Sequence, residues 1–215
     1  MESQLRNWLA EGRFEPIVEL ASSKKRVLSE LNALTYDPDP LISWRAVEAS
    51  GIAAGRIASR DPEHVRGHIR RLLWLLSDES GGIGWHAAET IGEIIRSRPD
   101  AFQDFAIALI ALLNIEPEDA VRFRCGTLWA IGRVAQVAPE AVLPALSDVA
   151  ACLKDPDPQV RGHAAWCLGQ LGAGHIVAQH QELLSDESSV EFYRDSHLLV
   201  CTVADLAGES VGSGT

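Results

Sequence analysis

The sequence has few of the features that mark secreted, membrane-spanning or disulfide-bonded proteins. Its four cysteines lie far apart without a CxxC pair, a pattern that predicts reduced cysteines in a cytoplasmic protein. No uninterrupted apolar run approaches the roughly 18 residues that a membrane helix needs. The first residues contain no apolar stretch typical of a secretory signal. We therefore expect a cytoplasmic location and no membrane partner.

Positive charge is also scarce. Lysine and arginine number 19 against 30 aspartates and glutamates, which gives a formal net charge of −11 and a pI near 5.0. This balance disfavours nucleic acid as a partner, because binding to phosphates requires a positive surface. The hydrophobic content of 47% and the charged content of 23% are typical of a globular chain rather than a disordered one.

Signatures of catalysis and metal binding are missing as well. The chain has no His-Glu dipeptide, no GxGxxG and no phosphate-binding loop. His64 and His68 are four residues apart on a predicted helix, a spacing that can bind zinc, but no glutamate follows either of them. We interpret both as surface histidines. We therefore expect no enzymatic activity, no catalytic residue, no cofactor and no metal.

The sequence does contain a glycine near the end of a short apolar helix, and this pattern occurs four times. The glycines are separated by 41, 40 and 37 residues. An apolar residue precedes each of them by nine places, and a small residue precedes each by five. A fixed period of about 40 residues indicates a helical solenoid. The four positions are Gly51, Gly92, Gly132 and Gly169.

One copy of this pattern carries a family resemblance. Residues 155–173, DPDPQVRGHAAWCLGQLGA, resemble the DPxVRxxAAxALGxLG consensus of HEAT-like repeats of the phycobilisome-lyase type, and residues 37–51 are a looser copy. The resemblance is strong from about residue 37 to 184. It implies an all-α fold, a right-handed α-α superhelix of about five helix pairs. Most proteins with the repeat are interaction modules, whereas the family name comes from bilin lyases.

We expect one solenoid over residues 1–207. The expected parts are an N-terminal cap or degenerate repeat at 1–36, repeats at 37–77, 78–115, 116–154 and 155–184, a C-terminal capping helix at 185–207 and a flexible tail at 208–215. In the first repeat the expected helices span about 40–59 and 62–76. Acidic residues before each first helix, such as Asp39 and Asp157, are interpreted as helix caps.

Tryptophans mark a candidate binding surface on the first helices. On a helical wheel, the positions three and seven before each glycine point away from the core, and four of the six tryptophans occupy them. Tryptophan is enriched in binding hot spots, so these positions predict a convex ridge that binds a partner. Its residues are Trp44, Arg45, Glu48, Trp85, His86, Glu89, Trp129, His163 and Trp166.

Two other interpretations of these indoles stay open. They can fill grooves between neighbouring first helices, in which case they belong to the core. They can also form a site for a flat ligand such as a tetrapyrrole, with His86 and Arg45 at its rim, and the resemblance to the lyase repeats would then imply a lyase- or chaperone-like role.

The second helices provide a second candidate surface on the concave side, where solenoids commonly bind. Opposite the apolar stripe of helix 62–76 stand Arg70, Arg71 and Trp74, which would suit an acidic or extended peptide. The alternative is a solvated surface with one stray tryptophan. The function expected from the sequence is a non-enzymatic scaffold or adaptor that binds another protein or a peptide.

Overall fold

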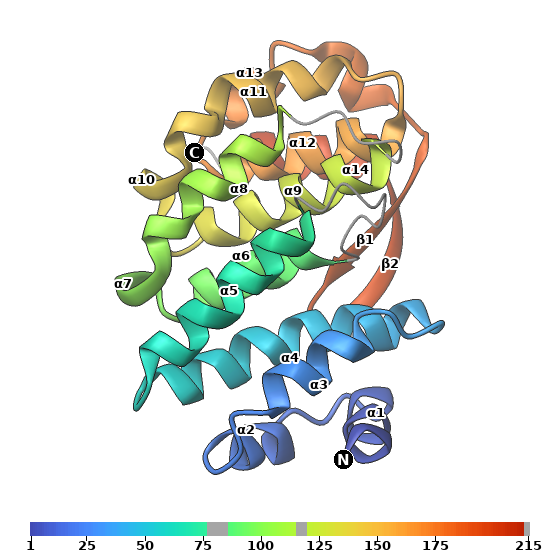
Figure 1. Ribbon diagram of the computed structural model, residues 1–215. Helices are drawn as coiled ribbons and strands as arrows, with labels where there is room; N and C mark the ends of the chain where they lie inside the picture. Colours follow the sequence, from blue (N-terminus) through green and yellow to red (C-terminus); the bar gives the residue numbers. More distant parts are fainter. Residues whose placement is uncertain (77–85, 115–119, 213–215) are drawn as a thin grey trace. The chain divides into compact units, whose positions relative to one another are not determined.

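The computed structural model describes residues 1–76, 86–114 and 120–212 (Figure 1). The chain divides into two compact units. Unit 1 consists of Met1–Gln103 together with Tyr193–Leu198, and unit 2 consists of Asp104–Phe192 together with Leu199–Thr215. The expectation of one continuous solenoid over residues 1–207 stays a prediction.

Unit 1 is built mainly from helices. They are α1 (Glu2–Ala10), α2 (Glu15–Ala21), α3 (Val27–Leu34), α4 (Pro40–Ala58), α5 (Pro62–Leu76), α6 (Ala87–Ser97) and α7 (Pro99–Phe102). The long helix α4 packs against α3 and against α6, and α5 packs against both α4 and α6 (Figure 1). The core of this unit therefore lies along α4.

The helices of the first repeat begin and end where the sequence predicts. Helix α4 spans Pro40–Ala58 and α5 spans Pro62–Leu76. Asp39 precedes α4, and its carboxylate accepts a hydrogen bond from the N–H of Leu41 at 2.9 Å. Proline then occupies the first turn, where its missing N–H has no helical partner to lose. The proposed capping role is confirmed at Asp39.

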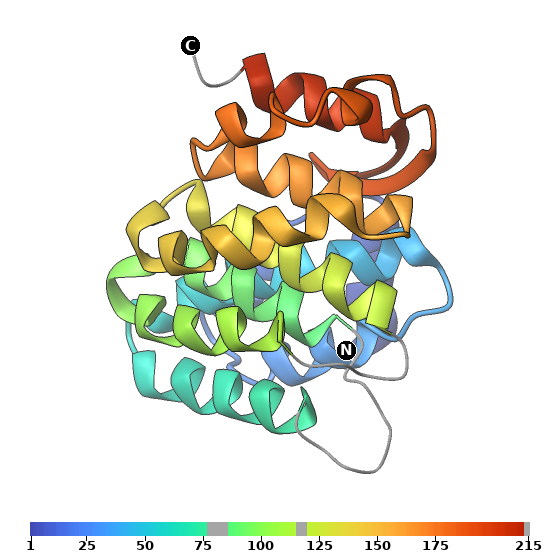
Figure 2. The same ribbon diagram turned by 90° about the horizontal axis from the view of Figure 1, so that it is seen from above.

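Unit 2 contains shorter helices joined by 3₁₀ turns. Its elements are η1 (Gln103–Phe105, whose first residue still belongs to unit 1), α8 (Ala106–Leu112), α9 (Ala120–Ala135), α10 (Pro139–Val142), η2 (Leu143–Ala145), α11 (Leu146–Ala151), η3 (Cys152–Lys154), α12 (Pro158–Gln170), α13 (Gly174–Val177), η4 (Gln181–Ser185) and α14 (Val203–Gly212). Helix α12 packs against α9 on one side and α14 on the other, as the yellow, orange and red layers of Figure 2 show. None of the helices within the described residues of the chain has both the length and the apolar character needed to cross a membrane.

The recurring glycine has a physical reason in both units. In unit 1, a Cβ atom on Gly51 of α4 would lie 2.7 Å from the carbonyl oxygen of Glu93 in α6. In unit 2, a Cβ atom on Gly132 of α9 would overlap the indole ring of Trp166 in α12. Each glycine therefore lets one first helix approach the next more closely than any side chain would permit.

The expected C-terminal capping helix is wrong over most of its length. Residues Ser189–Arg194 form strand β1 and His197–Thr202 form strand β2, and the two pair as a hairpin. Asp195 and Ser196 connect them with φ values of 53° and 61°. Positive φ at both central residues is what a two-residue turn needs to match the twist of the flanking strands. Valine and aromatic residues in β1 favour the strand over the helix.

The closing helix lies further along the chain than expected. It is α14 (Val203–Gly212), so the flexible tail expected at 208–215 is also wrong as far as Gly212. Thr202 and Asp205 form a reciprocal cap at its start, with N–H to side-chain distances of 2.8 and 3.0 Å. A Cβ atom on Gly169 of α12 would lie 2.7 Å from the Ser210 hydroxyl. Helix α14 therefore meets the last recurring glycine.

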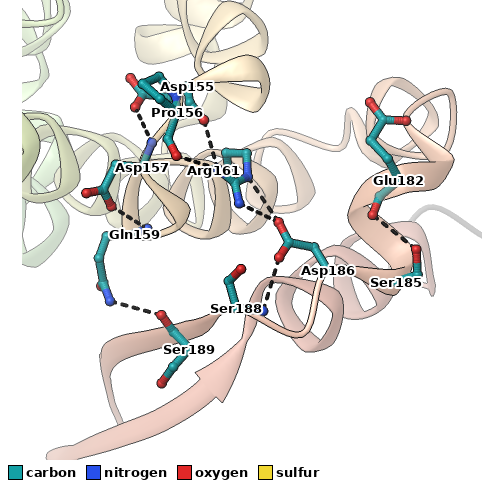
Figure 3. A network of polar contacts seen from close by, with 10 residues as sticks. All are labelled: Asp155, Pro156, Asp157, Gln159, Arg161, Glu182, Ser185, Asp186, Ser188 and Ser189. Atoms are coloured by element: carbon teal, nitrogen blue, oxygen red, sulfur yellow. Dashed lines mark hydrogen bonds and ion pairs between the residues drawn. The ribbon is translucent and has the colours of Figure 1, made fainter.

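The acidic loop before α12 also caps its helix (Figure 3). The carboxylate of Asp157 accepts a hydrogen bond from the N–H of Gln159 at 2.8 Å, and Asp155 accepts one from the N–H of Asp157 at 2.9 Å. Arg161 donates to the carbonyl oxygens of Asp155 and Pro156. The capping interpretation is thus confirmed at Asp157 too.

Arg161 also joins this loop to the residues that precede the hairpin. Its guanidinium lies 2.6 Å from the carboxylate of Asp186, which in turn accepts a hydrogen bond from the N–H of Ser188 at 3.0 Å (Figure 3). Partial burial alone would raise the pKa of Asp186, but the hydrogen bonds from Ser188 and Arg161 outweigh it and hold the pKa below its ordinary value. Asp186 is therefore ionised, and the contact is a salt bridge.

Candidate functional site

The ridge residues of α4 lie under the tip of the C-terminal hairpin, within unit 1. The indole of Trp44 is half-buried and stacks on the ring of Tyr193, with centroids 5.0 Å apart and planes inclined by 8°. The carboxylate of Glu48 accepts hydrogen bonds from the hydroxyls of Tyr193 at 2.6 Å and Ser196 at 2.8 Å. A segment of the same chain thus occupies this part of the predicted ridge.

Arg45 is buried, with 8% of its surface exposed. It donates to the carbonyl oxygens of Leu9 at 2.8 Å, Ala10 at 2.9 Å and Ser196 at 3.0 Å. Carbonyl oxygens of α1 and of the hairpin turn therefore surround its guanidinium. The exposure that we expected for Arg45 is wrong, because these carbonyl groups take the donors that a partner would need.

Tyr193 is the centre of the polar contacts at the hairpin tip. Its side chain is 3% exposed. Burial and the neighbouring Glu48 carboxylate raise the pKa of Tyr193 above its ordinary value. The phenol therefore stays protonated and remains a hydrogen-bond donor to Glu48. The arrangement holds the hairpin tip on α4 through one aromatic stack and two short hydrogen bonds.

His86 and Glu89 form a buried pair at the start of α6. The Nδ1 atom of His86 lies 2.9 Å from a carboxylate oxygen of Glu89, and the Nε2 atom lies 3.4 Å from the hydroxyl of Ser43. His86 has a φ of 55°. The order serine, histidine, carboxylate matches that of a nucleophile, a base and an orienting acid.

Two features of this group favour a structural role. Ser43 is 4% exposed, His86 5% and Glu89 6%, so a substrate has no path to the hydroxyl. Ser43 also donates to the carbonyl oxygen of Pro40 at 2.9 Å, the local bond typical of a serine in a first helical turn. The exposure that we expected for His86 and Glu89 is wrong, and their contacts fix the helix start.

The ridge residues in unit 2 are buried too. Trp129 is 1% exposed, Trp166 4% and His163 3%. The indole of Trp166 covers Gly132 and meets the ring of Phe192 edge-on, at a centroid distance of 5.0 Å. The expected exposure of these three residues is wrong. For Trp166, the interpretation that the indole fills a groove between neighbouring first helices is confirmed. Trp85 lies outside the described residues.

The second predicted surface is exposed. Arg70, Arg71 and Trp74 are all exposed on α5, and Trp74 is 64% exposed. The opposite side of α5 buries Val65, Ile69 and Leu72, as the sequence predicts. We call Arg70, Arg71 and Trp74 the α5 face.

Within α5 itself, three arginines stand against one acidic residue, Glu63. Glu63 lies 3.8 Å from the guanidinium of Arg66 and 3.9 Å from that of Arg70, and the Glu63 side chain is 75% exposed. Pairs at this distance and exposure are weak. Arg71 has no ion pair in the parts of the chain that the structure describes. The α5 face therefore has positive charge available for a partner.

The inner side of α5 corrects one expectation. His68 is 3% exposed and is not a surface histidine. Its burial, with the nearby positive charges of Arg71 and His64, lowers the pKa of His68 to about 4. His68 is therefore neutral near pH 7. Within residues 1–76, 86–114 and 120–212, no three histidine, cysteine or acidic side chains come together as a metal ion would require.

One sequence signal for catalysis was overlooked. Residues 208–212 read GESVG, which fits the GxSxG pattern of a nucleophile elbow. Ser210 lies inside α14, is 3% exposed, and donates to the carbonyl oxygens of Ala165 and Leu206. An elbow requires an exposed serine in a strand-to-helix turn, so this serine supports packing.

The hairpin tip was also missed, although the sequence contains a signal for it. Residues 189–202 hold two β-prone segments around Asp195-Ser196, a pattern typical of a hairpin. The four-position glycine pattern led us to place a helix there. No local signal places Tyr193 and Ser196 against Glu48, since that contact joins residues 145 and 148 positions apart.

Comparison with known proteins supports the repeat architecture. Residues 121–171 match the family model described as HEAT-like repeat. An uncharacterized protein of Archaeoglobus fulgidus is 29% identical over 184 residues, which is 84% of this chain and 93% of the relative. The resemblance to HEAT-like repeats is thereby confirmed.

Two solved structures share the fold. One engineered protein from the Northeast Structural Genomics Consortium has a TM-score of 0.51 and 17% identity, over 99% of this chain and 95% of that protein. Another from the same consortium has a TM-score of 0.51 and 14% identity, over 92% of this chain and 52% of that protein. At this identity the likeness bears on the fold alone. The all-α, HEAT-like fold class is confirmed.

Proposed function

We propose that this chain is a non-enzymatic interaction scaffold that binds another protein or a peptide through the α5 face. The observation that carries the proposal is the exposure of Trp74. Among the tryptophans in the described ranges, it is the one that is exposed, at 64%, whereas Trp129 and Trp166 are at most 4% exposed. Tryptophan and arginine are the residue types most enriched in binding hot spots.

The repeat architecture supports the same proposal. HEAT-like helix pairs build extended surfaces on which partners commonly bind, and the second helix of each pair contributes to the concave one. The predicted ridge offers less, because Arg45, His86, Glu89, Trp129, His163 and Trp166 are buried. The α5 face is thus the predicted surface whose three residues are all exposed.

A screen with a phage-displayed library of random peptides tests the proposal. Peptides enriched on the purified protein should lose most of their binding when Trp74→Ala is introduced. The matched control is Leu143→Ala, which truncates another exposed apolar residue in unit 2. Equal binding by the parent chain and Trp74→Ala, or an equal loss in both variants, would contradict the proposal.

The alternative role toward a tetrapyrrole depended on indoles open to a planar ligand. Trp129 and Trp166 are buried, and Trp44 already stacks on Tyr193. No observation on the described residues therefore favours it. A titration with haem or a bilin checks this: we expect no saturable quenching of tryptophan fluorescence, and quenching removed by Trp44→Phe would revive the alternative.

A further inference from the structure

Gly67 occupies the middle of α5, where the fold gives no reason for a glycine. A Cβ atom built on Gly67 would meet nothing within 4 Å. Gly51 differs, since its Cβ atom would strike the backbone of Glu93. Glycine inside a helix is less favourable than alanine, because the unfolded chain has more conformational freedom to lose. The described structure therefore permits alanine at Gly67, and helix stability favours it.

Gly67 lies on the same stripe as the α5 face. Glu63, Gly67, Arg70 and Trp74 are separated by four, three and four residues, so they lie above one another on one side of the helix. Arg71 follows Gly67 by four places and flanks this stripe. At Gly67, therefore, no Cβ atom covers the helix backbone. A glutamate lies on one side of this position, and two arginines and a tryptophan lie on the other.

The charge of this stripe indicates what can bind there. Helix α5 contains Arg66, Arg70 and Arg71 against a single acidic residue, Glu63, although the whole chain carries a net charge of −11. A positive segment on an acidic protein attracts a short acidic ligand, because two or three carboxylates need only the local field. A long polyphosphate backbone would instead meet the repulsion of the whole chain.

We propose that the uncovered backbone at Gly67 admits the main chain of an extended acidic peptide. Its carboxylates pair with Arg70 and Arg71, and an apolar side chain of the peptide packs on the indole of Trp74. This inference rests on the proposed function of the α5 face and adds the chemical class of its partner. Gly67 then serves binding at the expense of helix stability.

The test uses the full chain and a defined probe. The probe is a fluorescein-labelled peptide of alternating glutamate and aspartate with one central leucine. A control peptide has lysine in place of every acidic residue. We expect the acidic peptide to bind and the basic one not to. Gly67→Ala should weaken binding by at least about tenfold in Kd, since a methyl group would then block the approach of the peptide.

Gly208→Ala is the matched control. Gly208 also lies inside a helix, α14, and its added Cβ atom would likewise meet nothing within 4 Å. Both variants should raise Tm by about 1–4 °C, because both remove chain freedom from the unfolded state. Only Gly67→Ala should weaken binding. A rise in Tm also excludes misfolding as the cause of that loss.

Further outcomes separate this inference from the proposed function. If Trp74→Ala and Arg71→Glu weaken peptide binding but Gly67→Ala does not, the role of Gly67 is overturned and the α5 face stands. If the acidic probe does not bind while library peptides bind through Trp74, the acidic class is overturned alone. If a single-stranded oligonucleotide binds more tightly through the same residues, the partner is not a peptide. If no peptide depends on Trp74, both proposals are overturned.

Discussion

Trp166 and Trp74 present the same side chain in opposite settings. Trp166 belongs to α12, which packs between α9 and α14, and its indole fills the space above Gly132. Trp74 belongs to α5, where Arg70 and Arg71 are also exposed, and it is 64% exposed. Helix α12 contacts the second helix of its own repeat, α13, and also the helices on its two sides, α9 and α14. A position that points away from the second helix is therefore still buried when it faces a neighbour.

Replacing each indole by alanine should separate the two settings most strongly. We expect Trp166→Ala to lower the free energy of unfolding by about 3–5 kcal/mol, because it leaves a large cavity in packed surroundings. Trp74→Ala should change it by no more than about 0.5 kcal/mol. Denaturant unfolding followed by circular dichroism measures both. Similar losses in the two variants would mean that Trp74 contributes to the core.

Acid should destabilise the protein through His68, on the buried side of α5. The pKa of His68 is about 4 when folded against an ordinary value of 6.5, so the folded state binds fewer protons between these values. Stability should be fully present above about pH 6.5 and fall by about 3 kcal/mol as the pH drops to about 4. Unfolding curves at a series of pH values measure this.

The His68→Leu variant should lose less stability than the parent chain over that pH range. His64→Asn provides the control, since it replaces a half-buried histidine on the same helix and leaves His68 in place. A parallel decline in His68→Leu and the parent chain would exclude His68 as the source of the acid sensitivity.

Alanine substitutions at a packed glycine and at an uncovered one should change the free energy of unfolding in opposite directions. Gly132→Ala is expected to destabilise by about 1–3 kcal/mol, because the added methyl group overlaps the indole of Trp166. Gly67→Ala should stabilise by about 0.4–1 kcal/mol. The double variant Gly132→Ala, Trp166→Phe should recover part of the loss, and no recovery would mean that the overlap is not with Trp166. Thermal unfolding is sufficient to read the signs.

Trp44 is the intermediate case, and the hairpin determines its setting. Tyr193→Phe keeps the ring that stacks on Trp44 but removes the hydroxyl that donates to Glu48, so we expect a loss of about 1–2 kcal/mol. A double-mutant cycle with Glu48→Gln should show coupling between the two positions. Additive losses would mean that the hydrogen bond does not hold the hairpin.

Much of the helical plan was predictable because its signals are local. Asp-Pro pairs placed the starts of α4 and α5, and the apolar spacing identified Val65, Ile69 and Leu72 as buried. The exposed α5 face was predictable for the same reason, since the outer side of α5 follows from the position of its apolar stripe. The repeat frame failed at residues 189–202, where the recurring pattern was extended over a segment whose alternation and turn specify strands.

The sequence by itself determined capped helices and a glycine that recurs about every 40 residues, because capping and helix propensity act over a few residues and the recurrence is visible in the order of residues. Only the tertiary structure decided which tryptophans reach solvent. That outcome depends on the neighbours on every side of a helix, and at Trp44 on Tyr193, which comes from a hairpin near the other end of the chain. Contacts between residues so distant in sequence leave no periodic signal in either segment.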